Sequence, residues 1–137
     1  MLEKGFINRN IAKMIAEQGH GDLLMVVDAG FAIPKGLEVV DLSLKENVPS
    51  VTDIMSELSE YYSVERIIVA EETKEHNPSL LTKVNKIWGM PTNDFVLHTE
   101  LKALSCKVKG IIRTGDFTSF ANFILVSGCG TRWVSEY

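Results

Sequence analysis

The sequence has few cysteines, no excess of positive charge and no long apolar run, and each absence excludes a class of protein. Its 137 residues include two cysteines, Cys106 and Cys129, which form neither a disulfide framework nor a spaced metal pair. Fourteen Lys and Arg against 18 Asp and Glu leave a net charge of −4, so we do not expect nucleic acid as a partner. The longest uncharged stretch, 117–131, is too short to span a bilayer and contains polar residues, so no membrane partner is expected.

Motifs for cofactors and for export are also missing. The chain has no P-loop, no G-x-G-x-x-G and no H-E-x-x-H, and Gly128-Cys129-Gly130 is too short to cradle a phosphate. We therefore expect no cofactor and no metal. The first ten residues lack the apolar core of a signal peptide, which favours a cytoplasmic protein.

The composition and the spacing of apolar residues predict one α/β domain over residues 1–137. The chain is 45% hydrophobic, enough for a real core, and its apolar residues alternate between helical spacing and short continuous runs. The expected strands are 23–27, 37–42, 66–70, 94–97, 109–113 and 122–126. Helices are expected from Asn8 or Asn10 to Gly19, from Ser50, from Asn77-Pro78 and from a cap at Thr99. Short buried strands alternating with helices favour a mostly parallel sheet flanked by helices.

Polar residues that follow the predicted strands are the first candidates for a site, because ligands bind beyond the carboxyl ends of strands in such sheets. They are Asp28, the pair Glu71-Glu72, His98 and the segment 114–122.

Two histidines could take part in proton transfer. A turn could bring His20 near Asp28, and an imidazole beside a carboxylate can act as an acid or base near neutral pH. His98 and Lys102 are four residues apart and could share one helix face. For both pairs the simpler interpretation is that the residues cap a helix end or a loop and are exposed to solvent. We interpret His76 as a surface residue.

The segment from Arg113 to Asn122 combines hydrogen-bonding groups with aromatic rings. Sugar sites use this mixture, since a ring face covers C–H groups while amides and carboxylates bind hydroxyls. A turn that holds its own backbone explains the pattern equally well.

Taken in order along the chain, several motifs together are much more specific than any one of them. They are Gly5-Phe6-Ile7-Asn8, Gly19-His20-Gly21-Asp22, Asp28-Ala29-Gly30, Pro34, Asp41-Leu42-Ser43-Leu44, Ala70-Glu71-Glu72-Thr73-Lys74-Glu75-His76-Asn77-Pro78, His98-Thr99-Glu100-Leu101-Lys102 and Ile112-Arg113-Thr114-Gly115-Asp116-Phe117-Thr118. With these motifs the sequence resembles the D-ribose pyranase and fucose mutarotase family (RbsD/FucU). Two of these motifs, Asp28-Ala29-Gly30 and the one around His76, resemble the ribose branch of the family more than the fucose branch.

The resemblance implies an RbsD-like α/β fold and a homo-oligomer, commonly a decamer of two rings, with sites between neighbouring subunits. It implies an isomerase that interconverts the β-pyranose and β-furanose forms of a free monosaccharide, D-ribose, by acid/base ring opening without a cofactor. His20 corresponds to the proton donor. The sugar-binding positions correspond to Asp28, His98, Lys102 and the triplet Phe120-Ala121-Asn122.

The sequence departs from the family in two places. Phe120 stands where the family usually has Tyr, so a hydroxyl that would face the sugar is missing. The chain also continues through residues 130–137, which would either pack at a subunit contact or alter the mouth of the site. The alternatives are therefore a mutarotase for another sugar and a non-catalytic sugar-binding or regulatory protein on the same scaffold.

Overall fold

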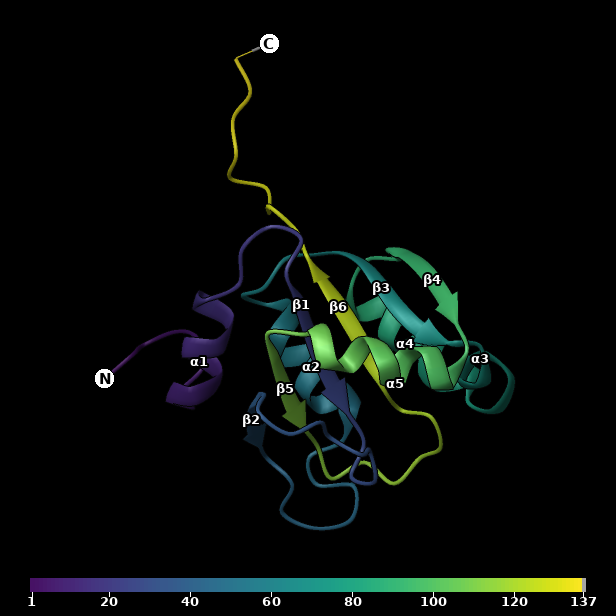
Figure 1. The fold of residues 1–137 in the computed structure, drawn as a ribbon. Helices are drawn as coiled ribbons and strands as arrows, with labels where there is room; N and C mark the ends of the chain where they lie inside the picture. The colour runs from purple at the N-terminus through teal and green to yellow at the C-terminus, as the bar shows by residue number, and fades with distance from the viewer. Residues whose placement is uncertain (137) are drawn as a thin grey trace.

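The computed structural model describes residues 1–136 as one six-stranded sheet with helices on both faces (Figure 1). The elements in chain order are α1 (Arg9–Ala16), β1 (Leu23–Val27), β2 (Glu38–Asp41), α2 (Val51–Ser59), β3 (Val64–Ala70), α3 (Glu71–His76), α4 (Pro78–Ile87), β4 (Thr92–Val96), α5 (His98–Leu104), β5 (Gly110–Arg113) and β6 (Phe123–Ser127). A 3₁₀ turn, Ser105–Lys107, follows α5.

The strand order is β2-β5-β1-β6-β3-β4, and one strand runs against the others. β5 is parallel to both β1 and β2, and β3 is parallel to β4. β6 lies between β1 and β3 and is antiparallel to both. The mostly parallel α/β sheet is thus confirmed, with β6 as the exception. Five strands therefore end, and β6 begins, at one end of the sheet, which we call the carboxyl end; the opposite one is the amino end.

Alternate residues of the central strands face two separate cores, as the pleat of a strand requires. Leu24 and Val26 of β1 belong to the larger core, together with residues of α1, α2 and α4. Met25 and Val27 face the other side, where Leu101 of α5 packs. In Figure 1, α5 lies in front of the sheet while α2 and α4 lie behind it. A strand buried on both faces explains the continuous apolar run of residues 23–27.

Three predicted helix starts are confirmed. The Asn8 side chain accepts hydrogen bonds from the backbone N–H groups of Asn10 and Ile11, at 3.0 and 3.1 Å. Ser50 and Asp53 form a reciprocal capping box at the start of α2. Pro78 occupies the first turn of α4, where its missing N–H costs nothing.

Two other local predictions are wrong, and one helix was not predicted. α1 ends at Ala16 rather than at Gly19, so a short loop leads to β1. α5 begins at His98, with Leu97 rather than Thr99 at its N-cap; no side chain caps it there, but the Glu72 carboxylate accepts the His98 N–H at 3.0 Å. The strand does end at Glu71-Glu72 as predicted, but this pair also opens α3, the helix that was not predicted from the sequence. Negative charge favours a helix N-terminus.

Residues 128–136 leave the amino end of the sheet and extend away from the rest of the chain (Figure 1). Trp133 in this segment is 78% exposed. None of the helices formed by residues 1–136 is both long enough and apolar enough to cross a membrane.

Candidate functional site

A cavity of about 300 Å³ lies at the carboxyl end of the sheet. Five of the site residues predicted from the sequence line it. They lie at the end of β1, on α5 and in the loop before β6. Its lining residues are Asp28, Gly30, Phe31, Ala32, His98, Lys102, Ser119, Phe120 and Asn122. Of the polar residues that follow the predicted strands, Asp28, His98 and Asn122 line this cavity, whereas Glu71 and Glu72 do not.

Asp28 and Asn122 both line this cavity and bond to each other, although 94 positions separate them in the chain. Asn122 accepts a hydrogen bond from the Asp28 backbone N–H at 2.9 Å, and its side-chain amide donates to the Asp28 carboxylate at 3.0 Å. The two meet because β6 runs antiparallel to β1, so that residue 122 precedes β6 where residue 28 follows β1.

Burial determines the electrostatics of Asp28. It raises the pKa of the Asp28 carboxyl above its ordinary value of 3.8, because a charged group loses hydration there. Hydrogen bonds from the Asn122 amide and from the Gly30 backbone N–H, the latter at 3.0 Å, oppose that rise. The carboxylate is thus held in a fixed orientation by neutral donors, with lone pairs left for a ligand hydroxyl.

His98 and Lys102 reach the cavity from the first two turns of α5, as their spacing of four residues predicts. The His98 imidazole is half-buried, and its Nδ1 is buried with no hydrogen-bond partner among residues 1–136. Unpaired buried polar atoms are uncommon and are found at functional sites. Lys102 is exposed and adds a positive charge at the rim.

Phe120 forms the aromatic wall of the cavity. Its ring packs edge-on against His98, with centroids 5.1 Å apart, and stacks on His76 at 5.5 Å. Its backbone has a positive φ of 55°, unusual for a bulky residue. The Thr73 hydroxyl donates to the Phe120 carbonyl at 2.8 Å and holds this conformation from α3.

Sequence reasoning missed this support from α3. His76 is exposed, as expected, yet it also forms part of the aromatic stack, and Asn77 donates to the Ser119 carbonyl at 3.0 Å. The only sequence signal was their place in the longest family-like motif. Ala121, by contrast, is fully buried and does not line the cavity, so its side chain packs in the core.

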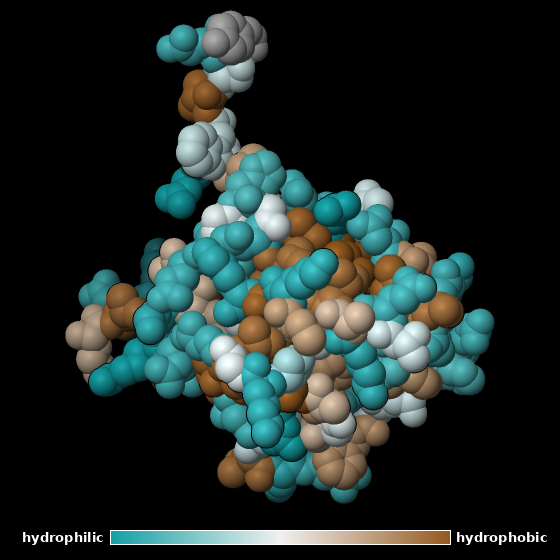
Figure 2. Space-filling view, viewed as in Figure 1, coloured by the Kyte–Doolittle hydropathy of each residue, from teal (hydrophilic) through white to brown (hydrophobic). Residues whose placement is uncertain are grey.

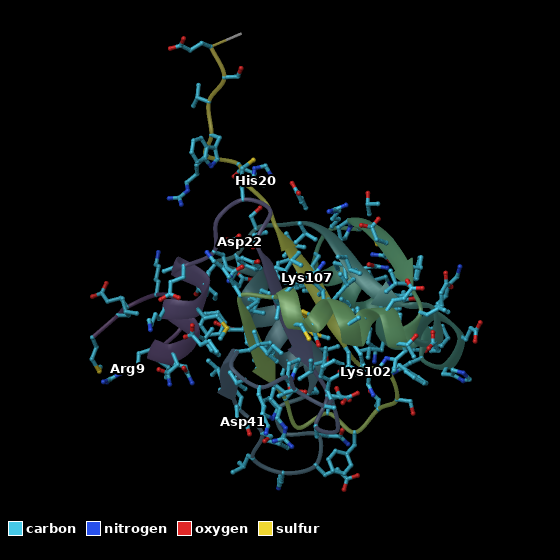
Figure 3. All side chains as sticks on the ribbon, viewed as in Figure 1. Arg9, His20, Asp22, Asp41, Lys102 and Lys107 are labelled. Atoms are coloured by element: carbon cyan, nitrogen blue, oxygen red, sulfur yellow. The ribbon has the colours of Figure 1, made fainter. Side chains whose placement is uncertain are left out.

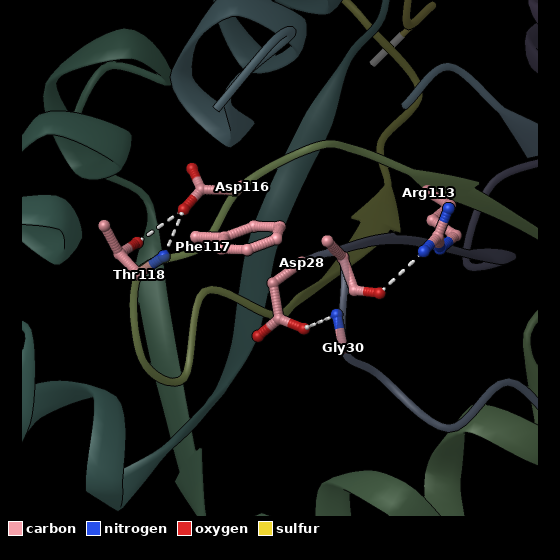
Figure 4. A pocket seen from close by; sticks show the side chains of 7 residues that line it. Asp28, Gly30, Arg113, Asp116, Phe117 and Thr118 are labelled. Atoms are coloured by element: carbon pink, nitrogen blue, oxygen red, sulfur yellow. Dashed lines mark hydrogen bonds between the residues drawn. The ribbon is translucent and has the colours of Figure 1, made fainter. Parts of the chain in front are cut away.

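A second cavity of about 370 Å³ adjoins the first and shares Asp28 and Gly30 with it (Figure 4). Arg113 donates to the Ala29 carbonyl at 2.8 Å, and Asp116 accepts from the Thr118 N–H and hydroxyl at 2.8 and 2.6 Å. The segment after β5 thus holds its own backbone, as the turn interpretation predicts, and it also lines a cavity.

His20 lies at the other end of the sheet. It is exposed, and its Nε2 is 2.9 Å from the Glu65 carboxylate at the start of β3. The extended strand β1 separates His20 from Asp28, and its five residues alone span roughly 16 Å. Figure 3 shows His20 and Lys102 far apart, at the two ends of the sheet. The expectation that a turn brings His20 near Asp28 is wrong within one chain.

Comparisons with known sequences match this chain to one protein family. The model of the RbsD / FucU transport protein family matches residues 1–130. D-ribose pyranases from Streptococcus uberis and Halalkalibacterium halodurans are 42% and 40% identical to the chain, in each case over 93% of this chain and 98% of that protein.

Among solved structures, Bacillus subtilis RbsD complexed with D-ribose is similar with a TM-score of 0.91 and 35% identity, over 96% of this chain and all of that chain. FucU from Bifidobacterium longum is similar in fold alone, with a TM-score of 0.74 at 19% identity over 91% of this chain and 97% of that chain.

Proposed function

The chain belongs to the RbsD / FucU transport protein family, and we propose that it is an isomerase that interconverts the β-pyranose and β-furanose forms of free D-ribose. The observation that carries this function is the cavity around the Asp28–Asn122 pair, in a fold that matches RbsD complexed with D-ribose. Its polar groups and its aromatic wall suit the hydroxyls and C–H groups of a sugar.

The reaction needs only proton transfers. Ring opening takes a proton from the anomeric hydroxyl and gives one to the ring oxygen, and closure reverses these steps at another hydroxyl. A positioned acid or base accelerates such a step by roughly 10²–10⁴-fold. This is enough for a ring exchange that already proceeds unaided.

In this proposal the side chains of the cavity have different roles in binding the sugar. The Asp28 carboxylate accepts from a sugar hydroxyl while Asn122 fixes its direction. His98 and Lys102 offer polar and charged groups from α5, and Phe120 covers the apolar face of the sugar. His20 is the proton-transfer group.

Because His20 and Asp28 lie at opposite ends of the sheet, a complete site takes His20 from one subunit and the Asp28 cavity from a neighbour. The homo-oligomer that this requires, a decamer of two rings by resemblance to the family, is also supported by apolar surface. Figure 2 shows hydrophobic surface beside α5, over the middle of the sheet. Leu23, Ile68 and Leu104 are only partly buried on this face. A second copy covering such a patch would remove it from water.

Saturation-transfer NMR on free ribose tests the activity. We expect pyranose–furanose exchange to rise in proportion to the protein concentration. A protein that ribose protects in a thermal-shift series without any exchange enhancement would instead be a sugar-binding protein. Exchange of another sugar but not ribose would identify a mutarotase of different specificity.

Mixed oligomers test the shared site. His20→Ala and Asp28→Ala are each expected to be inactive alone, and the two chains are then co-expressed and purified together. Random assembly pairs an intact His20 with an intact Asp28 in about a quarter of the shared sites, so about a quarter of the wild-type rate should return. Sites confined to one chain would recover no activity.

A further inference from the structure

Glu65 lies at an irregularity in β3. Val64 pairs with Ser127 of β6 and Arg66 with Val126, so Glu65 is an extra residue with no partner position of its own. Such a bulge bends the strand and redirects a side chain, and bulges are frequent beside active sites. Here the redirected carboxylate lies at the amino end of the sheet, next to the loop that carries His20.

The contact between Glu65 and His20 fixes which imidazole nitrogen carries the proton. The Glu65 carboxylate is an acceptor, so the Nε2 atom that lies 2.9 Å from it donates a hydrogen bond and keeps its hydrogen. A carboxylate that holds one ring N–H leaves the lone pair on the other nitrogen. For His20 this other nitrogen is Nδ1.

The backbone on both sides of His20 is held independently of Glu65. The Gly19 N–H donates to the Asp22 carboxylate at 2.7 Å, and the Lys109 ammonium donates to the same carboxylate at 2.7 Å. The Gly21 N–H donates to the Ser127 carbonyl at 2.8 Å. Asp22 and Lys109 pair with each other, and the Glu65 carboxylate is the charged group that contacts the imidazole.

We propose that Glu65 is the positioning residue of His20: it orients the imidazole and keeps the proton on Nε2, so that Nδ1 exchanges a proton with the sugar. Nδ1 takes the proton from one sugar oxygen and returns it to another, and the imidazole ends each turnover as it began. This role rests on the proposed ring-opening activity.

Three variants and one control test the role. Glu65→Ala removes the acceptor, Glu65→Gln removes the charge, and Glu65→Asp keeps the charge at a shorter reach. Glu38→Ala is the matched control, because Glu38 is also exposed near the start of a strand. Exchange rates over a range of ribose concentrations separate kcat from KM, and ¹⁵N NMR of the His20 ring reports its tautomer without any sugar.

We expect Glu65→Ala to lower kcat by roughly tenfold or more with KM nearly unchanged, and Glu65→Asp to recover part of the loss. Glu65→Gln should fall between them, and Glu38→Ala should equal the wild type. The His20 ring should change from one tautomer in the wild type to a mixture in Glu65→Ala. Full kcat in Glu65→Ala, or the same tautomer in both proteins, would overturn the proposal. Absence of exchange in the wild type would refute the activity instead, and the tautomer measurement would still decide the role of Glu65.

Discussion

The two ends of the sheet differ in how far their polar side chains are buried. At the carboxyl end, Asp28, Asn122 and His98 are partly or fully buried in a cavity, and two of them bond to each other across the chain. At the amino end, His20 is exposed on a short loop and contacts the carboxylate of Glu65, which is also exposed. One end therefore has a cavity that can enclose a ligand, while the other presents an exposed imidazole. The proposed reaction uses both, so it would require neighbouring copies of the chain.

The largest effect that this comparison predicts is a lower rate of ribose exchange when His20, at the amino end, is replaced. His20→Ala should lower ribose exchange by roughly 10²-fold or more, with little change in ribose affinity, because the cavity is formed elsewhere. Saturation-transfer NMR gives the rate and calorimetry the affinity. The thermal unfolding midpoint should not change, since the side chain is 58% exposed. Full activity in His20→Ala would remove His20 from the mechanism.

At the carboxyl end the expected effect is on binding. Asp28→Asn keeps the shape but replaces a charged acceptor, and it sets the new amide against the amide that Asn122 donates. A hydrogen bond to a charged group is worth about 1.5–3 kcal/mol, so ribose affinity should fall roughly 10- to 100-fold. Calorimetry with ribose measures this loss, and the His20 loop should be unaffected. Unchanged affinity would place the sugar outside this cavity.

A smaller effect is expected at the aromatic wall. Phe120→Tyr keeps the ring that packs on His98 and adds the hydroxyl that the family usually has. One recovered hydrogen bond should tighten ribose binding, or speed its exchange, by up to roughly tenfold. If ribose binding weakens instead, the cavity is shaped for another sugar. Parallel titrations with other pentoses and hexoses would then identify it.

The smallest effect concerns the loop that carries His20. A hydrogen bond from Lys109, followed by one from the Gly19 N–H, lowers the pKa of Asp22 below its ordinary value of 3.8. Because the charged form is favoured in the folded state, Asp22 stabilises the fold above pH 3.8, and this contribution is lost as the pH falls through the lower folded-state pKa.

Asp22→Asn should therefore lower the unfolding midpoint at pH 7 by roughly 1–3 °C, as expected for a surface ion pair. The difference from the wild type should vanish at the acid end of a pH series of thermal scans. Exchange should fall a few-fold, because the backbone beside His20 is less well held. A difference that persists when Asp22 is protonated would contradict this account.

Much of the fold and part of the site could be predicted from local sequence. The strand 23–27, the cap at Asn8 and the capping box at Ser50 depend on neighbouring residues, whose spacing the sequence displays directly. The shared face of His98 and Lys102 follows from helical geometry in the same way. The start of α5 differs from the prediction because Glu72, 26 residues away, binds the backbone that begins this helix.

The sequence by itself determined the strands, several helix starts and the residue types of a sugar site, because each depends on a few adjacent side chains. Only the tertiary structure decided how these parts meet. The reversed direction of β6 joins Asn122 to Asp28, and the bulge in β3 directs Glu65 to His20. The length of β1 keeps His20 away from the cavity. These arrangements depend on strand pairing between residues far apart in the chain, which no local pattern records.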